Sequence, residues 1–180
     1  MPEVMNRTWI MASRPIGEPE RENFELVESR VPEPQLGDVL IRTLYMSLDP
    51  YMRGRMNPGL SYTAGVSLGE VMGAGTVGQV VASRHDRFAE GDFVLSSNGW
   101  QEYAVSDGRG VRKLDPAAAP ISTAVGVLGM PGMTAYAGLL EVGELKDGDN
   151  VVVSAASGAV GAVVGQIAKI KGHRVVGVAG

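Results

Sequence analysis

The sequence contains no cysteine and only two histidines, His85 and His173, among its 180 residues. The missing cysteines exclude disulfide bonds, thiolate nucleophiles, iron–sulfur clusters and every zinc site that uses a thiolate ligand. Two histidines are also too few for a histidine-rich metal centre, so we expect no bound metal. Because disulfides are typical of exported proteins, their absence favours a cytoplasmic protein.

Long basic stretches are missing as well. The chain has 16 basic and 20 acidic residues, a formal net charge of −4, and its lysines and arginines form no stripe. This pattern argues against a nucleic-acid partner. The first 20 residues contain no apolar core of signal-peptide length, so we expect no export signal.

One uncharged run of residues, 151–168, raises the alternative of a membrane helix, since it contains the pattern Gly161-x-x-x-Gly165. Its polar side chains, its glycines and its β-branched start favour instead a buried strand followed by a helix. We therefore expect no membrane-spanning segment.

Charge is distributed unevenly along the chain. Residues 1–116 carry 28 charged side chains, whereas residues 117–180 carry only 8. The change in composition near Pro116 to Pro120 predicts two domains, residues 1–120 and residues 121–180.

The first part has the pattern of a β-rich domain. Short β-prone runs follow turn residues, and we expect strands at 39–46, 77–82, 93–96 and 101–105. Close spacing of short strands is typical of a small barrel or sandwich. The 25 glycines of the chain are about twice the usual share, and Gly69, Gly73, Gly75 and Gly78 are expected to interrupt one strand region at bulges or close backbone contacts.

The second part has the pattern of a parallel α/β unit. Residues 117–140 predict one or two helices, broken at 129–132, and residues 146–150 form a strong turn signal. A strand at 151–156, a helix at 159–171 and a strand at 174–179 then follow. Strand, turn, helix and strand in this order make a βαβ unit, which builds parallel sheets.

The turn between the first strand and the helix contains a glycine pattern typical of nucleotide-binding sites. Residues 155–161, AASGAVG, have the form A-x-x-G-x-x-G, with Ala155 where the common dinucleotide fingerprint has its first glycine. Gly158 would let a pyrophosphate approach the backbone, and Gly161 would allow close helix packing. The N–H groups of the first helical turn would face the anion. We predict that this turn binds a nucleotide; tight packing alone is the alternative.

The second strand indicates which nucleotide. A site that prefers NAD places an acid at the end of this strand, where it accepts from the ribose 2′-hydroxyl. Here the strand ends Val178-Ala179-Gly180 without an acid. NADP(H) is therefore the expected cofactor, unless the deciding residue lies further along the chain.

Three segments resemble signatures of one protein group. These are LDPYMRGRM at 48–56, GMPGMTAY at 129–136 and VVVSAASGAVGAVVGQIAK at 151–169. They are similar to the zinc-independent branch of the medium-chain dehydrogenase/reductase superfamily, the branch with the prostaglandin, plant double-bond and bacterial curcumin reductases. Zinc-dependent members use a cysteine near Ser47 and a Gly-His-Glu near Gly69. This sequence has neither, so the resemblance also implies no metal.

The resemblance implies a fold and a reaction. The fold is a GroES-like β-barrel domain followed by the start of a Rossmann-type parallel sheet. The reaction is reduction of the C=C bond of α,β-unsaturated aldehydes and ketones. Hydride passes from NADPH to the β-carbon of the substrate, and hydrogen bonds stabilise the resulting enolate. The full-length protein is expected to be a homodimer, and this chain, as a truncated portion of it, to be inactive by itself.

Candidate site residues follow from the same resemblance. Tyr51 and Tyr62 are the candidates for donating to the enolate, although a tyrosine is also an ordinary core residue. The segment expected to lie against the nicotinamide contains Met130, Pro131 and Thr134, whose hydroxyl could instead cap a helix. The residues expected to hold the cofactor in the glycine turn are Ala155, Ser157, Gly158, Ala159, Val160 and Gly161. Arg53 and Trp100 are expected to have structural roles.

Two other functions remain open from the sequence. A zinc-free quinone oxidoreductase would share the cofactor turn, although it would usually lack the DPYMRG run. A regulatory or structural protein could keep the nucleotide fold without turnover.

Overall fold

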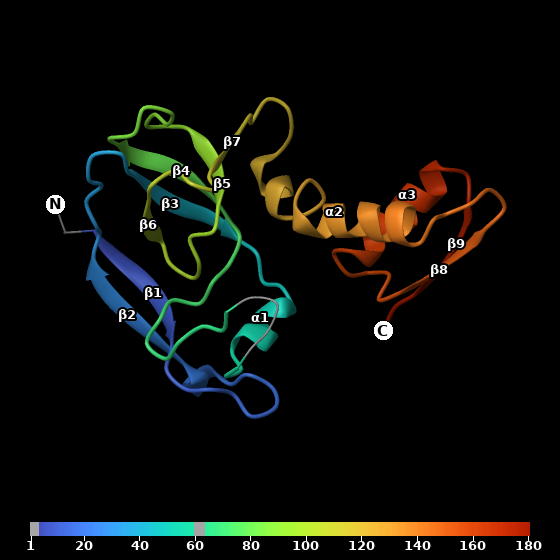
Figure 1. Cartoon of the computed structure of the whole chain (residues 1–180), viewed down its shortest axis with the longest axis horizontal. Coiled ribbons are helices and arrows are strands. Elements are labelled where there is room, and N and C mark those ends of the chain that lie inside the picture. Colours follow the sequence, from blue (N-terminus) through green and yellow to red (C-terminus); the bar gives the residue numbers. More distant parts are fainter. Residues whose placement is uncertain (1–3, 60–63) are drawn as a thin grey trace. The chain divides into compact units, whose positions relative to one another are not determined.

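A computed structural model describes residues 4–59 and 64–180 of the chain (Figure 1). The chain divides into two compact units, Met1–Ile121 and Ser122–Gly180. None of the helices in the described parts is long and apolar enough to cross a membrane.

The first unit begins with a two-stranded antiparallel ribbon. Strand β1 (Met5–Met11) pairs with β2 (Phe24–Arg30), and the short 3₁₀ turn η1 (Arg21–Asn23) leads into β2. Three side chains of β1 are buried, namely those of Asn6, Thr8 and Met11. Backbone bonds from Trp9 to Trp100 and from Glu102 to Arg7 tie this ribbon to the 99–102 loop.

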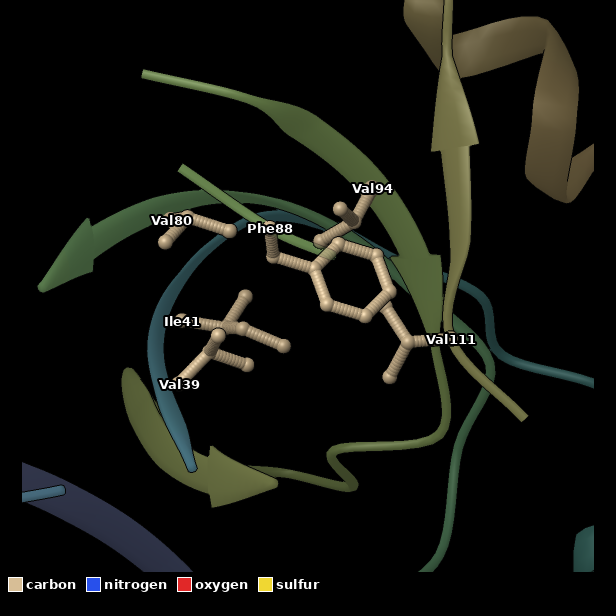
Figure 2. Packing of buried hydrophobic residues seen from close by; sticks show 6 residues of the cluster. All are labelled: Val39, Ile41, Val80, Phe88, Val94 and Val111. Atoms are coloured by element: carbon tan, nitrogen blue, oxygen red, sulfur yellow. The ribbon is translucent and has the colours of Figure 1, made fainter. Parts of the chain in front are cut away.

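The first unit also contains a five-stranded antiparallel sheet. Its order is β6-β3-β4-β5-β7. The strands are β3 (Val39–Met46), β4 (Thr76–Ser83), β5 (Phe93–Ser96), β6 (Tyr103–Ser106) and β7 (Arg112–Leu114). The sheet curls around one apolar cluster, in which the ring of Phe88 lies beside Val94 and Val111 (Figure 2). The other members are Val39, Ile41 and Val80.

The pairing of β3 with β4 depends on one glycine. A β-carbon at Gly78 would lie 2.5 Å from Cγ2 of Ile41 and 2.6 Å from the carbonyl oxygen of Arg42. The register of the pair shifts next to this point, between Thr43 and Tyr45. Gly78 therefore provides the close backbone contact expected from the sequence. Our expectation is wrong for Gly69, Gly73 and Gly75, which lie in the connection before β4 and interrupt no strand.

Helix α1 (Tyr51–Arg55) buries Met52 and is followed by a residue of a second apolar cluster. Met56, just after the helix, joins Met11, Val66 and Met72 in this cluster, and Phe24 and Trp100 pack against it. Because this second cluster joins β1, the end of α1 and two later loop segments, it holds together residues that are distant in sequence.

The second unit is a βαβ unit preceded by helices. The 3₁₀ turn η2 (Ile121–Val125) comes first, and α2 (Met130–Tyr136) continues directly into the π-helical η3 (Ala137–Val142). Strands β8 (Asn150–Ser154) and β9 (Arg174–Val178) then pair in parallel on either side of α3 (Gly161–Ile170) in the sequence. Helix α3 packs on both strands and on α2.

The two faces of the β8–β9 pair differ in exposure. Val151 and Val153 of β8, together with Val175 of β9, are wholly or partly buried. On the alternate positions, Val152 is 70% exposed, Val176 45% and Val178 57%. One face of the pair is thus packed, and the other is an exposed apolar surface.

The fold class predicted from the sequence is confirmed, with a β-rich first unit and a parallel βαβ second unit. The expected strand at 39–46 has the same bounds as β3, and the expected helix at 159–171 is observed as α3, Gly161–Ile170. Strands β1, β2 and β7 were not predicted. The expected strand at 151–156 ends earlier, at Ser154, because the chain turns at Ala155.

Candidate functional site

The turn between β8 and α3 has a tight and unusual backbone. Ala155 follows the last residue of β8 and has a left-handed conformation, with φ of +50°. The N–H of Gly158 donates to the carbonyl oxygen of Ala155 at 2.9 Å and closes the turn. A β-carbon at Gly161 would overlap that same carbonyl oxygen, so no larger residue fits there without movement. A β-carbon at Gly158 would lie 3.2 Å from the same oxygen, so the turn constrains position 161 more strongly than position 158.

Strand β9 fixes the position of this turn. The N–H of Ala156 donates to the carbonyl oxygen of Val178 at 3.0 Å. A β-carbon at Gly177 would lie 2.8 Å from the β-carbon of Ala156. The absence of a side chain at Gly177 thus lets the turn approach the end of β9. The role of Gly177 was not predicted from the sequence. The one feature that could have indicated its role is that a glycine stands within the apolar run of residues 175–178.

The turn presents backbone donors to solvent. Ser157, Gly158 and Ala159 are exposed, and Val160 at the N-cap position receives no side-chain cap. Within the described residues, the N–H groups of Ser157, Ala159 and Val160 donate to no acceptor of the chain. Exposed donors at the start of a ten-residue helix, together with the helix dipole, form a surface that accepts an anion. The turn therefore fits a dinucleotide pyrophosphate.

The other predicted cofactor residues lie in the first turns of α2. Pro131 is buried, and Met130 is 49% exposed at the start of the helix. The hydroxyl of Thr134 donates to the carbonyl oxygen of Met130 at 2.8 Å and remains exposed. The alternative role for Thr134 as a helix N-cap is wrong, because α2 begins at Met130 with Gly129 at the cap position.

The predicted catalytic tyrosines belong to the first unit. Tyr51 is the first residue of α1 and is half-buried. Tyr62 lies outside the described residues. Arg53, two residues after Tyr51, donates to the carbonyl oxygens of Pro15 and Gly17, which is a structural role. Trp100 packs on Phe24, with ring centroids 5.3 Å apart.

Carboxyl groups with perturbed pKa values lie in other parts of the first unit. The N–H of Ala89 and the ammonium of Lys113 lower the pKa of Asp92. The guanidinium of Arg7 lowers the pKa of Glu102 by a hydrogen bond and an ion pair. Residues 4–59 and 64–180 contain no group of three metal-ligating side chains. These carboxylates thus stabilise turns and strands of the first unit.

Comparison with known proteins identifies the relatives of the chain. Residues 7–114 match a family described as the N-terminal domain of oxidoreductase. The chain is 55% identical over 97% of its length to the NADPH-dependent curcumin reductase of Escherichia coli (strain K12), of which it covers 51%. It is 43% identical over 98% of its length to prostaglandin reductase 1 of Rattus norvegicus, of which it covers 53%. The chain belongs to the zinc-independent double-bond reductase group of the medium-chain dehydrogenase/reductase superfamily.

Solved structures agree with this assignment. The chain superposes on CurA from Vibrio vulnificus in complex with NADPH with a TM-score of 0.91 and 53% identity. The match covers 97% of this chain and 52% of CurA. The chain therefore spans about half the length of the curated and solved relatives that it matches.

Proposed function

We propose that the protein containing this chain is an NADPH-dependent reductase of the C=C bond of α,β-unsaturated aldehydes and ketones. The observation that carries the proposal is the 55% identity to the curcumin reductase, which extends over 97% of the chain and includes the β8–α3 turn. The exposed donors of that turn support a dinucleotide as the cofactor.

Residues of the second unit would hold the cofactor. The backbone of Ala155, Ser157, Gly158, Ala159, Val160 and Gly161 would receive the pyrophosphate. Strand β9 ends without an acidic residue that would repel a 2′-phosphate, which favours NADPH over NADH. When bound, NADPH supplies a hydride to the β-carbon of the substrate.

Other residues would position the nicotinamide and the substrate. The segment of Met130 and Pro131 would lie against the nicotinamide, with Met130 as its exposed apolar side chain, and the exposed hydroxyl of Thr134 would accept from the carboxamide. The phenols of Tyr51 and Tyr62 would donate hydrogen bonds to the substrate carbonyl oxygen. These bonds strengthen as negative charge develops on the oxygen, and so they lower the barrier to reduction.

The assembly and location of the protein are also proposals. We propose a homodimer for the full-length protein, on the basis of the family resemblance. A cytoplasmic location is supported by the absence of cysteine and by the moderately acidic composition.

The proposed function is tested by mixing protein of the full length of its relatives with NADPH and a simple enone, and following absorbance at the cofactor band. Enone-dependent loss of NADPH is the expected result. Loss with quinones only would support the zinc-free quinone oxidoreductase instead. Tight binding of NADPH without turnover of either substrate would support a non-catalytic nucleotide-binding protein.

Residues 1–180 prepared by themselves are expected to bind NADPH weakly and to show no reductase activity. The chain spans about half of each named reductase, and a face of its β8–β9 pair is exposed. Calorimetric titration with NADPH tests this expectation, and micromolar affinity would contradict it.

A further inference from the structure

We propose that Arg53 and Arg14 are positioning residues, which together fix the orientation of helix α1 and hence of Tyr51. The inference rests on the proposed function for the role of Tyr51. Its structural part concerns only the first unit and does not depend on the reaction.

Helix α1 cannot fix its own orientation. It has five residues, and Pro50 at its N-cap position makes no side-chain cap. Helices this short are unstable without tertiary contacts. One set of contacts comes from Met52 and Met56, four residues apart and both buried. Methionine side chains are flexible and adapt to many packing arrangements. They therefore keep the helix packed on the first unit without fixing its rotation.

Directional hydrogen bonds fix the rotation of helix α1, which the methionine contacts leave open. The guanidinium of Arg53 donates from Nε to the carbonyl oxygen of Gly17 at 2.9 Å and from Nη2 to that of Pro15 at 3.2 Å. Its third nitrogen, Nη1, donates to Oδ1 of Asn57 at 2.7 Å, one turn further along the chain. The planar guanidinium thus uses all three nitrogens, which fixes its plane relative to both the loop and the helix.

Arg14 makes the reciprocal contact. Its Nη1 donates to the carbonyl oxygen of Met56 at 2.7 Å, so the loop also donates to the end of the helix. The 14–17 loop and α1 are therefore joined in both directions. We call this pair of contacts the arginine clamp, made by Arg14 and Arg53.

The clamp lies next to Tyr51 in the sequence and in the helix. Tyr51 and Arg53 are two residues apart in α1, so a rotation of the helix moves the phenol and the guanidinium together. A small displacement of a hydrogen-bond donor in a catalytic site costs a large part of the rate. The clamp therefore gives Tyr51 the fixed position that donation to a substrate oxygen requires.

A double-mutant cycle in protein of the full length of its relatives tests the proposal. Arg53→Gln is expected to lower kcat with a cyclic enone at least tenfold while the KM for NADPH changes less than twofold. Arg53→Lys, which can keep one of the three bonds, is expected to recover part of the loss. Combining Arg53→Gln with Tyr51→Phe should give activity within about twofold of the more damaging single variant, because both remove the same contact. Arg109→Gln is the matched control, since Arg109 is exposed and bonds to Asp107 in its own turn.

Hydrogen exchange provides a readout that does not require activity. Arg53→Gln is expected to speed exchange of the Met52 and Met56 amides at least tenfold, with the amides of β3 unchanged. Unchanged exchange in α1 would overturn the proposal even if the wild-type protein reduces enones. Losses of activity that multiply in the double variant would also overturn it, since they would show that Arg53 acts independently of Tyr51. If the wild-type protein reduces no enone, the proposed function fails, and the exchange rates alone decide whether the clamp orients α1.

Discussion

Gly161 lies so close to the carbonyl oxygen of Ala155 that a β-carbon at position 161 would be 2.3 Å from this oxygen. The helix can begin where it does only because position 161 has no side chain. A glycine that sequence reasoning associates with a cofactor thus has a first role in packing.

Replacing Gly161 with alanine is expected to destabilise the second unit by about 1–3 kcal/mol, because the new β-carbon overlaps backbone atoms. Urea unfolding followed by circular dichroism measures the loss. Gly165→Ala is the matched control, since its β-carbon would lie 3.7 Å from Cγ1 of Val175, an ordinary contact. This control should be neutral or more stable than the wild type by up to about 1 kcal/mol. Equal losses in both variants would contradict the argument.

Replacing Ala155 with glycine is expected to stabilise the chain. Ala155 has φ of +50°, a conformation that costs an L-residue about 1–2 kcal/mol and costs glycine much less. The greater freedom of glycine in the unfolded chain offsets part of this gain, so a net increase of up to about 1 kcal/mol is expected. Thermal unfolding measures it. Ala156→Gly, at a residue without positive φ, should instead lower stability, and a gain there would count against a backbone origin.

Replacing Val152 with threonine is expected to reduce association of the 180-residue chain without loss of stability. Val152 is 70% exposed on the apolar face of the β8–β9 pair, and threonine keeps its β-branched shape. Light scattering across a concentration series measures association. In contrast, Val153→Thr places a hydroxyl at a position that is only 6% exposed and should destabilise the unit. Unchanged scattering by the Val152 variant would show that another surface is responsible.

Acid is expected to weaken the first unit partly through Asp92. Its pKa is lowered by the N–H of Ala89, which donates to Oδ2 at 2.8 Å, and by Lys113, whose Nζ lies 2.7 Å from the same oxygen. A lowered native pKa means that the unfolded chain binds the proton more readily. The stabilisation is therefore present above the ordinary aspartate pKa of about 3.9 and is lost as the pH falls through the native value.

The Asp92→Asn variant tests this linkage. At pH 7 it should be less stable than the wild type by less than about 1 kcal/mol, because the pair is partly exposed. The difference should shrink as the pH falls below about 4. Urea midpoints at several pH values measure it, and a difference independent of pH would exclude Asp92 as the titrating group.

The strands that could be predicted are those with continuous apolar runs and clear turn boundaries. Residues 39–46 follow the Gly37-Asp38 turn and form β3 with the expected bounds. Strand β1 was missed because two of its buried side chains, Asn6 and Thr8, are polar, and β2 was missed because it is mostly exposed. Most positions of β2 are exposed, so its sequence, FELVESR, has no clear apolar face.

The place of the glycine turn between a strand and a helix could also be predicted, since periodicity changes there. Its left-handed Ala155 could not, because alanine carries no local preference for positive φ. The surrounding packing imposes that conformation. The arginine clamp could not be predicted either, because Arg14 and Met56 are 42 positions apart in the sequence and only folding brings them together. The binding roles of the turn, of Thr134 and of Tyr51 stay predictions.

The hydrogen bond from Ala156 to Val178 has a consequence for the order in which the molecule assembles. The residues of the glycine turn are neighbours in sequence, yet the turn is hydrogen-bonded to β9, a strand that comes after α3 in the sequence. Parallel pairing requires that the intervening helix is first brought back across the sheet, which makes it a late and slow event in folding. During synthesis, the whole pattern from Ala155 to Gly161 leaves the ribosome before the strand that fixes it. The turn therefore acquires its final shape only after β9 has docked.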